Sequence, residues 1–146
     1  LEPVDSAEEA VTNADIICAA TTSSIPVLHY QDLKSGVHIN GVGSFQPSMQ
    51  EIDSETIKNA LVFVDSRESA LSETGDLTIP IQEGIIGKNH LRAEIGELLE
   101  NPSLGRKTPD EITFFKSCGV AVQDVVAAGM ALEQAKKHNL GRIIRM

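Results

Sequence analysis

"VHINGVGSFQPSMQEIDSETIKNALVFV", residues 37–64, is the stretch that decides the fold. Its two apolar segments, 37–42 and 61–64, have the composition of buried strands. Asp53 between them is typical of a residue that caps a helix, which we expect over residues 54–59. A strand, a connection that contains a helix and a second strand make a βαβ unit, so the two strands should run parallel in one sheet.

The sequence before this stretch predicts another unit of the same kind. Residues 16–20 are apolar without alternation, which favours a strand covered on both faces, as in a parallel sheet between two layers of helices. Ser6 and Glu9 have the spacing of a capping box, so a short helix should run from Ser6 to about Asn13. Consecutive βαβ units indicate an α/β fold.

The sequence after residue 66 is less regular. We expect helices over residues 68–73 and 90–100, a turn at Gly75-Asp76, a strand over residues 112–115 and a long helix from Gly119 to about His138. Small apolar residues recur every three or four positions along the long helix and predict one packing face. These residues are Cys118, Ala121, Val125, Ala128, Leu132 and Ala135.

The composition excludes several classes of protein. The 146 residues include 21 acidic and 12 basic side chains, whereas binding to a nucleic acid requires clustered Lys and Arg. The longest apolar runs, such as residues 16–20, are far too short to cross a bilayer, so we expect a cytoplasmic protein without a membrane partner. Cys18 and Cys118 are far apart in the sequence and are expected to be reduced and buried. The four histidines have no partner at metal-ligand spacing, and no metal site is predicted.

Polar and glycine residues follow two of the predicted strands, where an open parallel sheet binds its ligands. Thr21 to Ser24 offer four hydroxyls, and residues 41–44 offer two glycines. These features favour the rim of a nucleotide site, but they are equally typical of tight turns. The full Gly-x-Gly-x-x-Gly pattern is absent. Ser117 stands where a strand gives way to a helix, a place that suits an anion, an amide group or a simple helix cap.

Five stretches, in this order and spacing, resemble the ornithine cyclodeaminase/mu-crystallin family. They are ADIICAATTS (14–23), HINGVG (38–43), FVDS (63–66), AEIGE (93–97) and FKSCG (115–119). The resemblance extends from about Asp5 to Leu132. It implies an NAD(P)-binding Rossmann domain and a second domain that holds the substrate and forms a homodimer.

The resemblance implies that this chain is the carboxyl half of such a protein, and the opening Leu1-Glu2-Pro3 agrees with a piece of something longer. Residues 1–115 would form the second part of the Rossmann domain, without its amino-terminal part. Residues 116–146 would form the returning helix and tail, which join the substrate and dimerisation domain. The expected fold is therefore a partial Rossmann-type parallel sheet with flanking helices and a long C-terminal helix.

The resemblance also implies roles for individual residues. Thr21 matches a hydroxyl beside the cofactor, which is NAD or NADP. Val42 matches a residue whose backbone meets the nicotinamide ring, so that the ring is the implied neighbour of the glycines on either side of Val42. Ser117 matches a contact near the nicotinamide amide, and Glu73 matches an acidic residue near the bound ligand.

Phe45 departs from the pattern of true ornithine cyclodeaminases. These enzymes carry an Asp at this position that acts in deamination and ring closure, and a phenyl ring cannot exchange a proton. The resemblance therefore implies an NAD(P)-dependent oxidoreductase that transfers hydride at the C=N or C–N carbon of a small cyclic imino acid or an amino acid. The alternatives are ornithine cyclodeaminase itself and a non-catalytic binder of NAD(P) or a small ligand. For the piece alone we expect no catalysis and weak binding of the cofactor. Its exposed sheet edges and last helix should drive self-association or pairing with the missing half.

Overall fold

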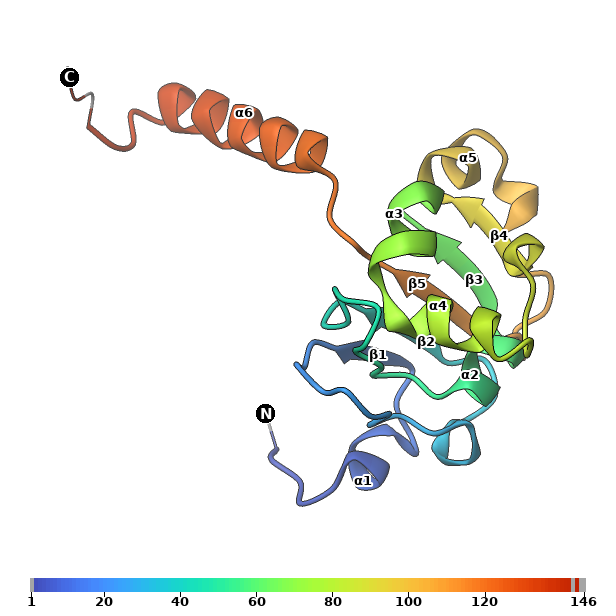
Figure 1. Cartoon of the computed structure of the whole chain (residues 1–146). Coiled ribbons are helices and arrows are strands. Elements are labelled where there is room, and N and C mark those ends of the chain that lie inside the picture. The colour runs from blue at the N-terminus through green and yellow to red at the C-terminus, as the bar shows by residue number, and fades with distance from the viewer. Residues whose placement is uncertain (1, 143, 145–146) are drawn as a thin grey trace.

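The fold is built on one sheet of five parallel strands in the order β1-β2-β5-β3-β4 (Figure 1). The computed structural model describes residues 2–142 and 144. The strands are β1 (Ile16–Ala19), β2 (His38–Gly41), β3 (Leu61–Val64), β4 (Leu91–Glu94) and β5 (Thr113–Lys116). The predicted α/β fold with a parallel sheet is confirmed.

Short helices connect the strands, and one long helix ends the chain. They are α1 (Ala7–Val11), α2 (Ser54–Asn59), α3 (Arg67–Glu73), α4 (Gly75–Gln82), α5 (Ile95–Glu100) and α6 (Ala121–Lys137), with 3-10 turns η1 (Tyr30–Asp32), η2 (Lys88–His90) and η3 (Pro102–Leu104). The predicted caps form: the Ser6 hydroxyl accepts the N–H of Glu9, and the Asp53 carboxylate accepts the N–H of Thr56. These side chains satisfy N–H groups that have no partner inside the helix.

The five strands end at the same level. In the register of the sheet, Ala19 pairs with Gly41, Gly41 with Lys116, Lys116 with Val64, and Val64 with Glu94. Each of these residues is the last of its strand. The segments that follow the strands therefore leave the sheet side by side along one straight edge.

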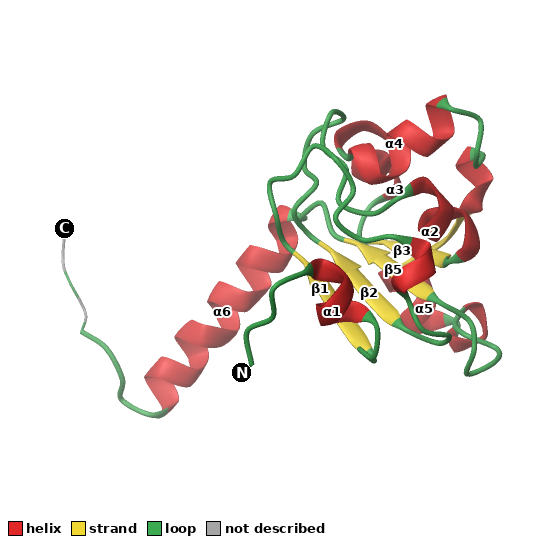
Figure 2. Cartoon of the chain, turned by 90° about the horizontal axis from the view of Figure 1, so that it is seen from below, coloured by secondary structure: helices red, strands yellow, loops and turns green. Residues whose placement is uncertain are grey.

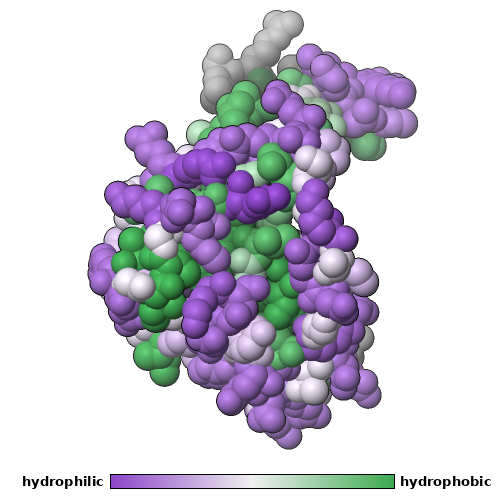
Figure 3. Space-filling model, turned by 90° about the vertical axis from the view of Figure 1, so that its right-hand side faces the viewer, coloured by the Kyte–Doolittle hydropathy of each residue, from purple (hydrophilic) through white to green (hydrophobic). Residues whose placement is uncertain are grey.

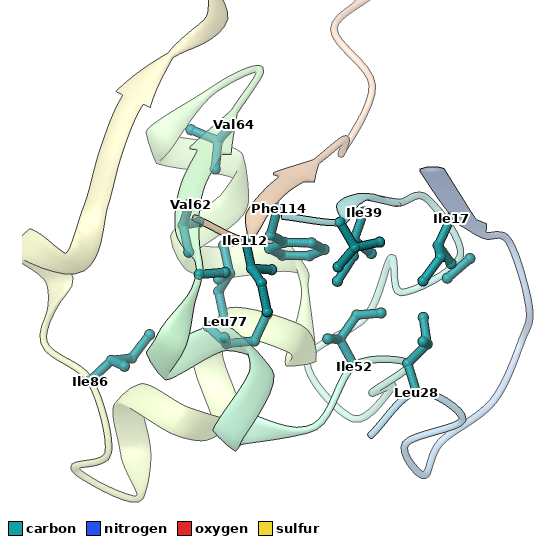
Figure 4. Packing of buried hydrophobic residues seen from close by; sticks show 14 of the residues in the cluster. Ile17, Leu28, Ile39, Ile52, Val62, Val64, Leu77, Ile86, Ile112 and Phe114 are labelled. Carbon is teal, nitrogen blue, oxygen red and sulfur yellow. The ribbon is translucent and has the colours of Figure 1, made fainter. Parts of the chain in front are cut away.

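The hydrophobic core lies on one face of this sheet (Figure 4). Ile39, Val62 and Phe114 point from the sheet toward Ile52 and Leu77, and all five side chains are fully buried. Leu77 belongs to α4, which packs with α2 on this face. The apolar runs that predicted strands thus supply the sheet side of the core.

The opposite face of the sheet is largely open. Side chains that alternate with the core residues border a cavity of about 470 Å³ there, together with α5 and the segment after η3. Its lining consists of His38, Asn40, Phe63, Ile95, Leu98, Gly105, Arg106, Thr113 and Phe115. On the side of the molecule that carries β4 and α5, hydrophobic side chains also gather at the surface between hydrophilic ones (Figure 3).

The open face of the sheet corrects two expectations, one for β1 and one for the cysteines. Only Ile17 and Ala19 are buried, whereas Ile16 is 66% exposed and Cys18 is exposed as well. The prediction that this strand is covered on both faces is therefore wrong. The prediction that both thiols are buried is also wrong, since Cys18 lies on the open face and Cys118 is half-buried.

Two predicted elements differ in kind from those observed. Gly75 and Asp76 begin α4 instead of forming a turn, because burial of Leu77 and its neighbours against the core favours a helix there in spite of Pro80. Residues 91–94 form β4 instead of the first turn of a helix, and only residues 95–100 are helical. Leu91 and Ala93 are buried and alternate with exposed Arg92, which is the pattern of a strand that pairs with β3.

The long helix α6 extends away from the sheet (Figures 1 and 2). Of the predicted packing face, Cys118 packs against the core, whereas none of the face residues that lie in α6 itself is buried. Val122, Val125 and Met130 are each more than 60% exposed. Of the helices that the structure describes, none has both the length and the apolar character that a membrane crossing needs.

Candidate cofactor site

The three residues predicted to meet the cofactor lie along one edge of the sheet. Thr21, Val42 and Ser117 follow β1, β2 and β5, which are neighbours in the sheet and end at the same level. The backbone joins them: the N–H of Val42 donates to Ala19 O at 2.8 Å, and the N–H of Ser117 donates to Gly41 O at 3.0 Å. The structure thus brings together three residues that span almost a hundred positions of sequence.

Val42 and Thr21 are accessible at this edge, and Ser117 is partly so. The Val42 side chain is 51% exposed. The Thr21 hydroxyl accepts the N–H of Ser23 at 3.1 Å, a local turn of the kind that the sequence left open. The side chains of Thr21, Val42 and Ser117 are short and carry no acid or base, so these three residues can place a ligand but cannot themselves act as a general acid or base.

Asp65, the first residue after β3, reaches across to the start of the segment that leads from β5 to α6. Its carboxylate accepts the Ser117 hydroxyl at 3.1 Å and the N–H groups of Cys118 and Gly119 at 2.9 and 2.8 Å. The Asp65 carboxylate therefore occupies the backbone N–H groups that the sequence analysis assigned to a possible anionic ligand. Burial raises the pKa of the Cys118 thiol to about 11, and the charge of Asp65 acts in the same direction.

The glycines on either side of Val42 are required by the chain itself. A Cβ on Gly41 would lie 2.7 Å from the ring of Phe114. A Cβ on Gly43 would lie 2.5 Å from Oε1 of Glu51 and would also collide with the backbone of Thr21. The expectation that a nicotinamide ring explains these glycines is thus corrected: neighbouring protein atoms fill the space that their side chains would need.

Glu51 is the main residue of this site that the sequence reasoning missed. It is fully buried in the connection between β2 and α2. Its carboxylate accepts the N–H groups of Gly43 and Ser44 at 2.7 and 3.0 Å, and also the N–H of Thr21. Its position between the buried residues Met49 and Ile52 was the available signal, but a single acidic residue in a polar loop is usually solvated.

A buried ion pair lies directly beneath the same edge. Asp76 and Lys116 are both fully buried, with Oδ2 and Nζ 3.7 Å apart, and Lys116 also donates to Gly41 O at 3.0 Å. Asp76 Oδ1 accepts the N–H groups of Glu51 and Ile52 at 2.7 and 3.1 Å. Burial raises the pKa of Asp76 to about 6, although Lys116 and the two N–H groups oppose the shift. The sequence reasoning missed this pair because Asp76 was assigned to a surface turn.

Glu73, at the end of α3, and Phe45, in the loop after β2, lie near each other at this edge. Glu73 is exposed at the end of α3, and the hydroxyl of the next residue, Thr74, lies 2.8 Å from that of buried Ser44. Phe45 follows Ser44 and is 56% exposed. The structure thus places the predicted substrate residue near the loop that carries the departure from the cyclodeaminase pattern. No group of three or more His, Cys, Asp or Glu side chains within the described residues could hold a metal ion.

Comparisons with known proteins agree with this architecture. The pattern of the ornithine cyclodeaminase/mu-crystallin family matches residues 1–139. A Delta(1)-pyrroline-2-carboxylate reductase of Bacillus cereus is 46% identical over 140 residues, which are 95% of this chain and 43% of the relative.

Two solved structures resemble the fold closely. The Delta(1)-pyrroline-2-carboxylate reductase of Thermococcus litoralis, in complex with NADH and L-proline, has a TM-score of 0.89 and 40% identity, and the match covers 97% of this chain and 44% of that one. An archaeal alanine dehydrogenase dimer with bound NAD has a TM-score of 0.85 and 36% identity, over 99% and 44% of the two chains. The chain spans less than half the length of these relatives. It belongs to the ornithine cyclodeaminase/mu-crystallin family.

Proposed function

We propose that this chain is the later part of an NAD(P)-dependent oxidoreductase that transfers hydride to the C=N carbon of a small cyclic imino acid. The observation that carries the proposal is the alignment of the ends of β1, β2 and β5, with Thr21, Val42 and Ser117 side by side. The relative solved with NADH and L-proline supports the reaction, since L-proline is the product of hydride addition to pyrroline-2-carboxylate.

The three aligned residues would hold the nicotinamide end of the cofactor. Val42 is about half-exposed, so a flat ring can lie against it. The Ser117 hydroxyl donates a hydrogen bond to Asp65, which leaves the lone pairs of its oxygen free to accept a hydrogen bond from the nicotinamide amide N–H. Hydride transfer depends on holding the ring at close range, and this edge supplies placement more than reactivity.

The substrate would lie on the side of Glu73 and Phe45. Glu73 presents an exposed carboxylate that can meet the charged imine nitrogen of the substrate. Phe45 offers an exposed apolar ring and no exchangeable proton, so reduction of an imine fits this site better than the deamination of ornithine. The likeness to an alanine dehydrogenase supports a second candidate, the oxidation of a linear amino acid.

The whole enzyme would need a part that precedes Leu1. That part would bring the Gly-rich turn and helix start that bind the dinucleotide phosphates. It would also cover the open face of the sheet, with its cavity of about 470 Å³. The exposed apolar side chains of α6 suit a role in a second domain, which residues 116–146 would join and which would form a homodimer in the cytoplasm.

Turnover by a polypeptide extended at its amino end to the length of its relatives tests the proposal. We expect oxidation of NADH or NADPH with pyrroline-2-carboxylate or piperideine-2-carboxylate, and no ammonia from ornithine. The 146-residue chain alone should show no turnover. Turnover of alanine in place of the cyclic imino acids would favour the second candidate. Tight binding of the cofactor with no activity on any imine or amino acid would contradict both and indicate a non-catalytic binder.

A further inference from the structure

Glu51 is a buried carboxylate that backbone groups balance. Its side chain is fully buried, and the ion pairs found among residues 2–142 and 144 do not include it. Its two oxygens instead accept three N–H groups, from Thr21, Gly43 and Ser44. Because a buried charge is costly unless it is hydrogen-bonded, these bonds are strong constraints on the groups that donate them.

The three donors belong to two separate segments. Thr21 lies in the segment after β1, and Gly43 and Ser44 lie in the segment after β2. One carboxylate therefore ties the two segments together, at the edge where Thr21 and Val42 are exposed. The absence of a side chain at Gly43 makes the arrangement possible, since a Cβ there would lie 2.5 Å from Oε1 of Glu51.

Hydrogen bonds of its own backbone fix the position of Glu51. Its N–H donates to Asp76, and its carbonyl accepts the N–H groups of Val27 and Leu28 at 2.8 and 3.1 Å. Asp76 in turn pairs with Lys116, the last residue of β5 before Ser117. The carboxylate is thus fixed to the strands that carry all three candidate cofactor residues, while its full burial keeps it from touching a ligand.

We propose that Glu51 is a positioning residue, which sets the spacing between the segments after β1 and β2 so that a nicotinamide dinucleotide meets Thr21 and Val42 together. The inference rests on the proposed function. It assigns to Glu51 no contact with the cofactor and no proton transfer. The role is to hold two stretches of backbone in one fixed relation before the ligand arrives, which lowers the cost of ordering them when it binds.

The substitution Glu51→Gln tests this role with little change in shape. Oε1 of Glu51 accepts the N–H of Thr21, and Oε2 accepts those of Gly43 and Ser44. A Gln side chain replaces one of these oxygens by an NH₂ group, which is a donor, so one of the two segments loses its acceptor. In the 146-residue chain we expect amide hydrogen exchange at Thr21, or at Gly43 and Ser44, to become at least about tenfold faster. Exchange at Ile39 and Phe114 in the sheet should stay unchanged. Glu68→Gln, at an exposed position on α3, is the matched control and should alter neither set of amides.

A second measurement connects the positioning role of Glu51 to function. In the extended polypeptide, Glu51→Gln should lower kcat for imine reduction by about tenfold while the KM for NADH changes less than about threefold, because the phosphates are bound elsewhere. Equal acceleration of exchange throughout the sheet, or an unchanged kcat, would overturn the inference. If Glu51→Gln does not fold, Glu51→Asp keeps the charge but is too short to reach both segments, and the same two measurements apply.

The two proposals fail in different ways. Absence of turnover by the unmutated extended polypeptide contradicts the proposed function. The exchange experiment then decides the role of Glu51 by itself. Faster exchange confined to Thr21, Gly43 and Ser44 supports that role, and unchanged exchange at these amides overturns it.

Discussion

Gly43 and Gly96 differ in the space that their surroundings leave for a Cβ atom. A Cβ on Gly43 would collide with the backbone of Thr21 and with Glu51, whereas a Cβ on Gly96 in α5 would meet no atom within 4 Å. Gly43→Ala should therefore lower the free energy of unfolding by at least about 2 kcal/mol. Gly96→Ala should leave it unchanged or raise it by up to about 1 kcal/mol, because Ala favours a helix. Urea unfolding of both variants measures the difference, and equal effects would contradict the close approach at Gly43.

The two cysteines should differ in reactivity. Cys18 is exposed on the open face of the sheet, whereas burial raises the pKa of Cys118 to about 11. Because the thiolate is the reactive form, N-ethylmaleimide should modify Cys18 at least about tenfold faster than Cys118 at neutral pH. Mass spectrometry of timed samples identifies the modified residue, and Cys18→Ser should abolish the fast phase. A fast phase that persists in this variant would show that Cys118 is more accessible than the structure indicates.

At the scale of elements, the sequence predicts best where local signals and burial agree. The helix over residues 54–59 and the strand over residues 61–64 are confirmed to the residue, since a capping Asp and a short apolar run mark them clearly. Residues 75–82 were missed because Gly and Pro are typical of turns, and only the packing of Leu77 against the core overrides that preference. Residues 91–94 were misassigned because a four-residue strand joined directly to a helix has no boundary signal.

Helix α6 should drive self-association of the isolated chain. Val125 and Leu132, on the predicted packing face, are 70% and 56% exposed, and none of the residues of this helix is buried. The 146-residue chain should therefore sediment as dimers or larger species at micromolar concentration, since an exposed apolar face of this kind is seldom left open. The double substitution Val125→Glu/Leu132→Glu should raise the apparent dissociation constant at least about tenfold.

Gln134→Glu, a change of charge elsewhere on the exposed surface of α6, is the control and should leave association as it is. A chain that sediments as a single monomer without any substitution would contradict the prediction for this element.

At the scale of the whole molecule, stability should depend on pH through Asp76. Burial raises its pKa from 3.8 to about 6, so between these values the folded chain binds a proton that the unfolded chain has released. The contribution of this group is therefore complete below its unfolded pKa and is lost as pH rises through about 6. Taken alone, it lowers the free energy of unfolding by about 2 kcal/mol between about pH 4 and about pH 7.

Urea unfolding at about pH 4 and about pH 7 measures this dependence. Asp76→Asn should remove the fall in stability over this range, whatever its effect on stability at any one pH. Asp124→Asn, on the exposed surface of α6, should retain the fall. A variant Asp76→Asn with the full pH dependence of the original chain would assign the effect to other groups.

The candidate site also shows what a sequence alone can provide. Thr21, Val42 and Ser117 could be picked out because each follows a strand and matches a family position, and the register of the sheet places them together. The residues that hold them, Glu51 and the pair Asp76–Lys116, could not be picked out. Their partners are backbone groups far away in the sequence, and such contacts leave no local pattern.

A crystal structure of the extended polypeptide with bound NADH tests the central claim most directly. The account predicts that the nicotinamide ring lies against the backbone of Val42, with Thr21 beside it and the Ser117 hydroxyl within hydrogen-bonding distance of its amide. A nicotinamide ring bound away from the ends of β1, β2 and β5 would contradict it.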